Sequence, residues 1–287
     1  MKFEIRLTVD FAFKSTIGNP KHPDITRHFI HSVLNDREPI HSVDYLNPTI
    51  SGDLNNAKLS QLDIRLRDDR GRHLNIEMQA STQGALAQRL AYYTARIYAG
   101  QMNKGDDYGL LRPSIGIWVL DRPMPKVSSK LHMQFQLRTD VGEVLGDGLI
   151  IHLVQLPFLA SDEHNVKYAS RLEQWAYFLK NAHLFTARKI ARILPDPVFQ
   201  EAMGVLSMIS RDPKKRIQYE GRLKAQLDEN HLRNHSRREG RAEGQITFLE
   251  QLLQLPETPA EELESWSLEQ LTARVEELKK QWGRGAS

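Results

Sequence analysis

The chain has 287 residues, enough for one domain of about 150 to 200 residues and an appendage. It contains no cysteine, which excludes disulfides, thiolate metal ligands and cysteine nucleophiles and fits a reducing compartment, so we expect a cytoplasmic protein. No run of about 18 apolar residues occurs and the N-terminus is charged, so we expect neither a signal peptide nor a membrane partner. The formal net charge of +3 is too small to predict a general attraction to nucleic acid.

Two helices are expected first. One begins near Thr8 or Asp10, either of which would cap it, and ends at Gly18 before Pro20. The other covers about residues 24–35, where apolar side chains recur at helical spacing and predict one buried stripe. Residues 40–46 then predict a strand, and residues 51–57 a polar loop.

Residues 61–79, QLDIRLRDDRGRHLNIEMQ, predict a β-hairpin because apolar and polar side chains alternate along both halves. Residues 69–71 suit a three-residue loop, in which Gly71 is free to adopt the left-handed conformation. The apolar face then consists of Leu62, Ile64, Leu66, Leu74, Ile76 and Met78, and the polar face of Asp63, Arg65, Asn75, Glu77 and Gln79.

In this register Asp68 lies opposite Arg72, and Asp63 therefore lies opposite Glu77. Two carboxylates at facing positions of neighbouring strands are roughly 5 Å apart and repel each other unless a cation lies between them. A hard divalent metal would use that geometry. The alternative is that both acids simply face solvent, as polar residues of an exposed antiparallel sheet do.

A helix over about residues 83–103 follows, with Leu86, Leu90, Tyr93 and Ile97 as its core stripe and Gln88, Arg89, Tyr92 and Arg96 on another flank. Residues 114–120, SIGIWVL, form a nearly continuous apolar run, which is typical of a strand covered on both faces. Residues 131–137 and 149–156 predict a second hairpin that extends the sheet. Helices are expected at residues 166–181 and 197–210.

The composition changes at residue 211. Residues 211–243 carry ten Lys and Arg against six Asp and Glu, which predicts a solvent-exposed helix or a flexible connector. From residue 245 the balance reverses to four against eight, and the leucine pattern predicts a small helical hairpin that is a candidate for self-association. Its expected buried positions are Leu252, Leu253, Leu268, Leu271, Val275 and Leu278.

These elements occur in an order that resembles the PD-(D/E)XK nuclease fold, and within it the Rpn family of recombination-promoting nucleases and transposases. The matching segments are DFAFK from Asp10, LDI from Leu62, NIEMQ from Asn75 and RLAYYTARIY from Arg89, followed by Gly105, Tyr108 and Pro113. The resemblance implies a restriction-endonuclease-like α/β domain, with a mixed central sheet flanked by helices, and an α-helical C-terminal tail. With the change of composition at residue 211, we expect three parts: a nuclease-like domain with a helical extension (residues 1–210), a charged helical connector (211–244) and a small amphipathic helical module (245–287).

The resemblance also implies roles for particular residues. Asp63 and Glu77 match the acids of the core strands, and Asp10 matches the acid of the first helix; together they would hold Mg²⁺, or Mn²⁺ as the alternative ion. Gln79 stands where the superfamily has a lysine, so it can orient water but brings no charge. Lys14, Arg89 or Arg96 would then supply the missing charge. Gln88 and Tyr92 match a Gln-x-x-x-Tyr pattern of some members, and both are candidates for DNA contact.

The implied function is that of a metal-dependent DNA endonuclease, linked to recombination or mobile elements and associated with the nucleoid when it acts on DNA. Catalysis would rest on Asp63, Glu77 and Gln79. The alternative, favoured by Gln79 and by the long helical tail, is a DNA-binding or assembly protein that keeps the nuclease scaffold without its chemistry.

Overall fold

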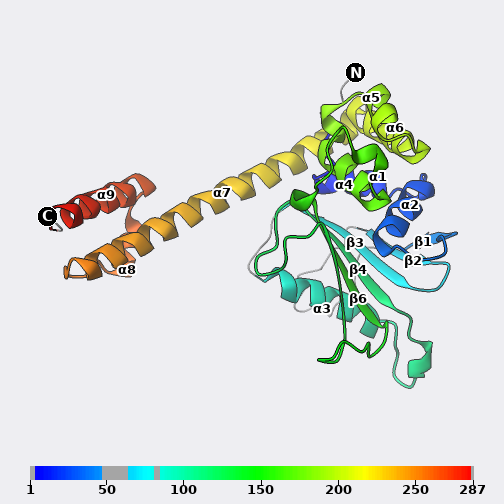
Figure 1. Ribbon diagram of the computed structural model, residues 1–287, viewed down its shortest axis with the longest axis horizontal. Helices are drawn as coiled ribbons and strands as arrows, with labels where there is room; N and C mark the ends of the chain where they lie inside the picture. Colours follow the sequence, from blue (N-terminus) through cyan, green and yellow to red (C-terminus); the bar gives the residue numbers. More distant parts are fainter. Residues whose placement is uncertain (1–3, 47–63, 81–84, 286–287) are drawn as a thin grey trace. The chain divides into compact units, whose positions relative to one another are not determined.

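The computed structural model describes residues 4–46, 64–80 and 85–285 of the chain, and Figure 1 shows it as a ribbon. The chain divides into two compact units, residues 1–223 and residues 224–287. The three-part division drawn from composition stays a prediction.

A mixed six-stranded sheet forms the centre of the first unit. The strand order is β1-β2-β3-β4-β6-β5. β3 and β4 pair in parallel, as do β4 and β6, whereas the remaining neighbours are antiparallel. The strands are β1 Val43–Tyr45, β2 Ile64–Asp68, β3 His73–Gln79, β4 Ser114–Leu120, β5 His132–Gln136 and β6 Leu149–Gln155. The predicted α/β architecture, a mixed sheet with flanking helices, is confirmed.

Helices cover both faces of this sheet (Figure 1). One face packs against α1 Asp10–Ile17, α2 Pro23–Leu34, α4 Arg171–Asn181, α5 Ala187–Ile193 and α6 Pro197–Arg211, in a core centred on the large side chains Phe13, Phe29, Trp175, Phe178 and Phe199. The other face packs against α3 Leu86–Ala99, which connects the parallel strands β3 and β4. Because β4 lies between the two layers, every one of its residues is buried, as its apolar run predicts.

The β2–β3 hairpin has the predicted register. Ile64 pairs with Ile76, Arg65 pairs with Asn75, and Gly71 has a φ of 77°, the left-handed conformation that the turn requires. The Asp68 carboxylate fixes the turn by accepting hydrogen bonds from the backbone N–H groups of Arg70 and Arg72. The alternation therefore sends one set of hairpin side chains into the core and leaves the polar set on the face toward α3.

Most other elements lie near their predicted positions. The second predicted hairpin is formed by β5 and β6, and β4 and α6 have nearly the predicted bounds. The helix predicted at residues 166–181 begins later, at Arg171, where Ser170 and Glu173 form a reciprocal cap. α5 was not predicted, because its seven residues are too few for a clear periodic pattern. The first helix also lacks the predicted side-chain cap, since its N-cap is Val9.

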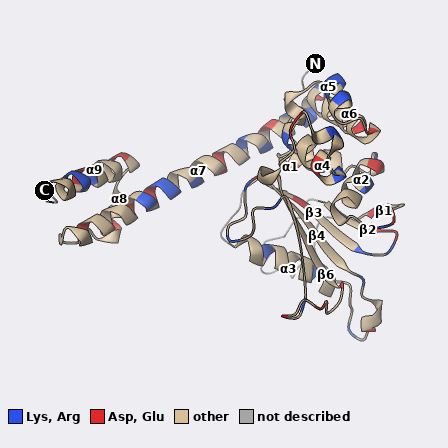
Figure 2. Cartoon of the chain, viewed as in Figure 1, with Lys and Arg blue, Asp and Glu red and all other residues tan. Residues whose placement is uncertain are grey.

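The charged segment after residue 211 is helical: α7 Pro213–Leu252 runs without interruption through it (Figures 1 and 2). In the second unit, the end of α7 packs with α8 Ala260–Ser265 and α9 Leu268–Gly285. Leu271, Val275 and Leu278 are buried as predicted, but the prediction was wrong for Leu252, whose side chain is 46% exposed because it lies on the far side of α7. No described helix combines the length and the apolarity needed to cross a bilayer.

Candidate active site

Glu77 and Gln79 lie on the polar face of β3, and the alternation of that strand explains why. Ile76 and Met78 are buried in the main core, so the intervening side chains point toward the layer that contains α3. Both polar residues are partly buried, and the side chain of Glu77 is only 12% exposed. A carboxylate with so little exposure needs a compensating cation.

α3 is fixed firmly over this part of the sheet. Leu86 and Leu90 pack against Trp118 and against the neighbouring apolar residues Leu120 and Leu153. Farther along the helix, the Ser114 hydroxyl donates to the Thr94 carbonyl oxygen at 2.9 Å. These contacts hold the beginning of α3, and with it Arg89, beside the end of β3.

Arg89 joins the two polar residues of β3. Its Nη2 atom lies 3.1 Å from Glu77 Oε1 and 3.3 Å from Gln79 Oε1, and it donates to both oxygens. Two side chains that are two residues apart on one strand therefore direct oxygen atoms at one point, and a positive charge occupies that point. Of the three cations predicted to supply charge at Gln79, Arg89 is thus in contact with it.

Several buried polar atoms along the polar face of the sheet and on α3 have no hydrogen-bond partner in the described part of the chain. They belong to one face of β2, β3 and β4 and to α3: Arg65 Nε, His73 Nδ1, both amide atoms of Asn75, Trp118 Nε1 and Arg89 Nε. Burial lowers the pKa of His73, and the nearby Arg65 and Arg67 lower it further. Buried polar atoms without partners are rare in proteins and cost stability. Their concentration here indicates a face shaped for a purpose other than stability.

The sequence pattern had assigned Arg65 and Asn75 to this face without giving them a role. Asn75 is fully buried and lies between Arg65 of β2 and Gly116 of β4 in the strand register. Only the packing of α3 over the sheet reveals that its amide is shielded from water.

Asp63, the other predicted strand acid, lies outside the described residues. The observed pairing of Ile64 with Ile76 matches the predicted hairpin register. That register is the one from which Asp63 is expected opposite Glu77. Among the described residues, no three His, Asp or Glu side chains come close enough together to hold a metal ion. The oxygen ligands present nevertheless suit a hard cation. The partly buried Glu77 carboxylate and the Gln79 amide oxygen converge on the guanidinium of Arg89, where a cation already lies.

Asp10 and Lys14 come from α1, which packs against β3 from the other layer. Asp10 is the first residue of that helix, and its Oδ1 accepts from the Phe11 backbone N–H at 2.7 Å. Its Oδ2 lies 3.8 Å from Arg222 Nη1, so this carboxylate has a cationic neighbour of its own. Lys14 lies one turn farther along and is partly buried.

The remaining candidates lie on the outer flank of α3. Arg96 Nη1 donates to the Tyr92 hydroxyl at 2.9 Å, and its guanidinium lies 5.9 Å from the centre of that ring. Tyr92 is 55% exposed, and Gln88, one turn before it, is also exposed. The three side chains thus share an accessible polar and aromatic flank that begins beside Arg89 and extends about two turns beyond it.

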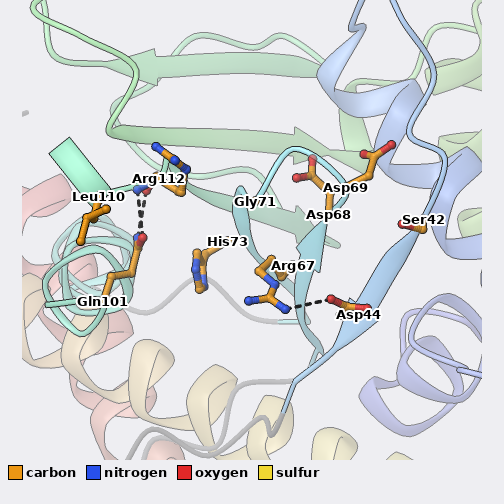
Figure 3. A pocket seen from close by; sticks show the side chains of 10 residues that line it. All are labelled: Ser42, Asp44, Arg67, Asp68, Asp69, Gly71, His73, Gln101, Leu110 and Arg112. Atoms are coloured by element: carbon orange, nitrogen blue, oxygen red, sulfur yellow. Dashed lines mark hydrogen bonds and ion pairs between the residues drawn. The ribbon is translucent and has the colours of Figure 1, made fainter.

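A cavity of about 570 Å³, which no sequence pattern predicts, opens at the hairpin end of β2 and β3 (Figure 3). His73 lies between Gln101 and Arg67 in this view, and Arg67 Nη2 contacts Asp44 Oδ2 at 3.0 Å. Four residues of extended strand, about 13 Å, separate His73 from Glu77. Both acidic and basic side chains line this cavity, and Asp44 neutralises Arg67 within it.

A family model described as PD-(D/E)XK nuclease family transposase matches residues 7–236, which is most of the chain. Neither the curated proteins nor the solved structures contain a match. The chain belongs to the PD-(D/E)XK nuclease family of transposases, and the predicted resemblance is confirmed. This membership supports a nuclease-like or transposase-related role.

Proposed function

We propose that this protein is a divalent-metal-dependent DNA endonuclease that hydrolyses phosphodiester bonds in recombination or mobile-element DNA of the cytoplasm. The observation that carries the proposal is the convergence of the Glu77 and Gln79 oxygens on one cationic point, formed by Arg89. That point lies on the strand where the family has its catalytic acid. Nucleases of this superfamily generally use divalent metals.

In this mechanism Glu77 and Asp63 bind the metal, with Asp10 as a further candidate ligand. Bound Mg²⁺, or Mn²⁺, would polarise the phosphodiester and lower the pKa of the attacking water. Gln79 orients that water through its amide oxygen, and Arg89 provides the positive charge that the superfamily lysine would otherwise bring. Gln88, Tyr92 and Arg96 form a flank that can contact the DNA strand beside the site.

A cleavage assay tests the proposal. Full-length protein is incubated with duplex and single-stranded DNA in Mg²⁺, Ca²⁺ or EDTA, and Glu77→Ala is compared with Glu143→Ala, a control in an exposed loop of the same unit. We expect Mg²⁺-dependent products from wild type and from the control, with a loss of at least a hundredfold in Glu77→Ala. Equal nicking by wild type and by Glu77→Ala would refute the proposal, because a contaminant would then explain the products.

The second candidate is a non-catalytic DNA-binding or assembly protein on the same scaffold. Gln79 in place of a lysine favours it, and so does Arg89, because the guanidinium already neutralises the Glu77 carboxylate. This candidate predicts salt-dependent DNA retention without product, unchanged in Asp63→Ala. Retention measured at several salt concentrations, beside the cleavage assay, separates the two.

Self-association through the C-terminal helices stays a prediction. Phe248 and Leu252 lie one turn apart on α7 and are 62% and 46% exposed, so they are apolar side chains available to a partner. Light scattering of the full chain and of a Phe248→Ser, Leu252→Ser double variant measures the mass in solution. A monomeric wild type would contradict the prediction.

A further inference from the structure

Arg89 contacts the Glu77 carboxylate in a way that leaves its own hydrogen-bonding capacity incomplete. Nη2 donates to two oxygens, but Nε is buried and has no partner in the described part of the chain. An arginine fork normally uses two parallel N–H donors on one carboxylate or phosphate. The observed contact is therefore a weaker arrangement than the guanidinium can achieve.

The position of Arg89 on its helix also indicates that its observed environment is not the best one for a guanidinium. It lies at the fourth residue of α3, close to the N-terminus, where the helix dipole disfavours a cation and favours an anion. No acidic residue lies in the first turn of α3 to offset this effect. The negative charge that compensates Arg89 comes from Glu77 on the neighbouring strand.

A divalent cation bound by Glu77, with its water oriented by Gln79, would need the same oxygens that Arg89 contacts. The guanidinium and the metal repel each other at such a distance, so the two cannot share these oxygens without cost. A phosphate group beside the metal would in turn present acceptors to both Nε and Nη2, and it would lie near the favourable end of the α3 dipole.

We propose that Arg89 is an exchangeable cation of this site: it holds Glu77 and Gln79 in the metal-free protein, is displaced when a divalent metal binds, and then becomes a phosphate ligand. The inference rests on the proposed function and adds the regulation of the metal site by a residue of α3. In the metal-free state the Glu77 carboxylate is neutralised and the arginine is unavailable to DNA. Metal binding therefore creates both the metal site and the phosphate contact.

Metal affinity is the first readout, and it requires no catalytic activity. Calorimetric titration of Mn²⁺ into the full chain compares wild type with Arg89→Ala, with Arg89→Lys, and with the control Arg188→Ala on the exposed surface of α5. Because a competing charge about 3 Å from the carboxylate is removed, we expect Arg89→Ala to bind Mn²⁺ roughly threefold to tenfold more tightly. Arg89→Lys, which keeps the charge, and Arg188→Ala should stay within twofold of wild type.

DNA affinity is the second readout. In EDTA, wild type and Arg89→Ala should bind a short duplex equally, because the wild-type guanidinium is held by Glu77. In Ca²⁺, wild type should bind at least fivefold more tightly than Arg89→Ala, because the released arginine contacts phosphate. Circular dichroism establishes that each variant is folded.

Unchanged or weaker Mn²⁺ binding in Arg89→Ala would overturn the inference, and so would an equal loss of DNA affinity in EDTA and in Ca²⁺. Glu77→Ala separates this failure from failure of the proposed function. If Glu77→Ala binds Mn²⁺ as wild type does, the metal site itself is wrong. If it loses Mn²⁺ binding while Arg89→Ala gains none, only the exchange is wrong.

Discussion

Gly116 of β4 sets how closely α3 can approach the sheet. A Cβ atom at this position would lie 2.7 Å from Thr94 Oγ1 and 2.9 Å from Trp118 Nε1. Both neighbours are buried, at 2% and 0% exposure, so neither can move into solvent. Gly116→Ala therefore forces a shift of the helix that carries Arg89 or of the Trp118 ring.

Both of these contacts are closer than the 3.5 to 4.0 Å of ordinary carbon contacts. Overpacking of a filled core costs about 1 to 3 kcal/mol, and the lower backbone entropy of alanine returns up to about 1 kcal/mol. The free energy of unfolding should therefore fall by up to about 3 kcal/mol. In a unit of this size each kcal/mol corresponds to roughly 2 to 4 °C, so Tm should fall by up to about 12 °C.

Gly204→Ala in α6 is the matched control, because among the described residues no atom beyond its chain neighbours and its own helix backbone lies within 4 Å of its Cβ position. Removing glycine from a helix interior should stabilise the unit by about 0.5 to 1 kcal/mol, the opposite sign. Thermal melts and urea titrations of the three proteins give both values. A Gly116→Ala protein that melts at or above the wild-type temperature would refute the close packing of α3 from which the position of Arg89 is argued.

Three further predictions concern the Asp68 ion pair, the titration of His152 and the metal site. Arg72→Met leaves the Asp68 carboxylate, which is 0% exposed, without its ion pair. Urea titration should therefore show that the free energy of unfolding falls by about 3 to 5 kcal/mol. A fall below about 1 kcal/mol would contradict the pairing. Burial, assisted by His132, lowers the pKa of His152 to about 4, so the unfolded chain takes up this proton first as the pH falls. The free energy of unfolding should thus decline by up to about 3 kcal/mol as the pH falls from 6.5 to 4. In urea titrations of His152→Gln this decline should be smaller. Millimolar Mg²⁺ should raise the Tm of wild type but not of Glu77→Ala, and an equal rise in both would place the metal elsewhere.

The site was only partly predictable. Alternation along residues 61–79 was sufficient to predict the hairpin, its turn and the polar face that carries Glu77 and Gln79, since a strand with one face in the core leaves a single register. The choice among three cations was not predictable, because Lys14, Arg89 and Arg96 all lie on helices at plausible spacing. The docking of α3 through Leu86 and Leu90 brings Arg89 to Glu77 and leaves Arg96 with Tyr92.

Local pattern, then, determined which elements form and which faces they bury, because periodicity of 2 or 3.6 is a property of neighbouring residues. The single buried run of β4 and the hairpin of β2 and β3 are of this kind. The tertiary structure decided which side chains from distant elements meet, because that depends on how a helix packs over a sheet. The contact of Arg89 with Glu77 and the burial of Asn75 without a hydrogen-bond partner among the described residues arise only in this way.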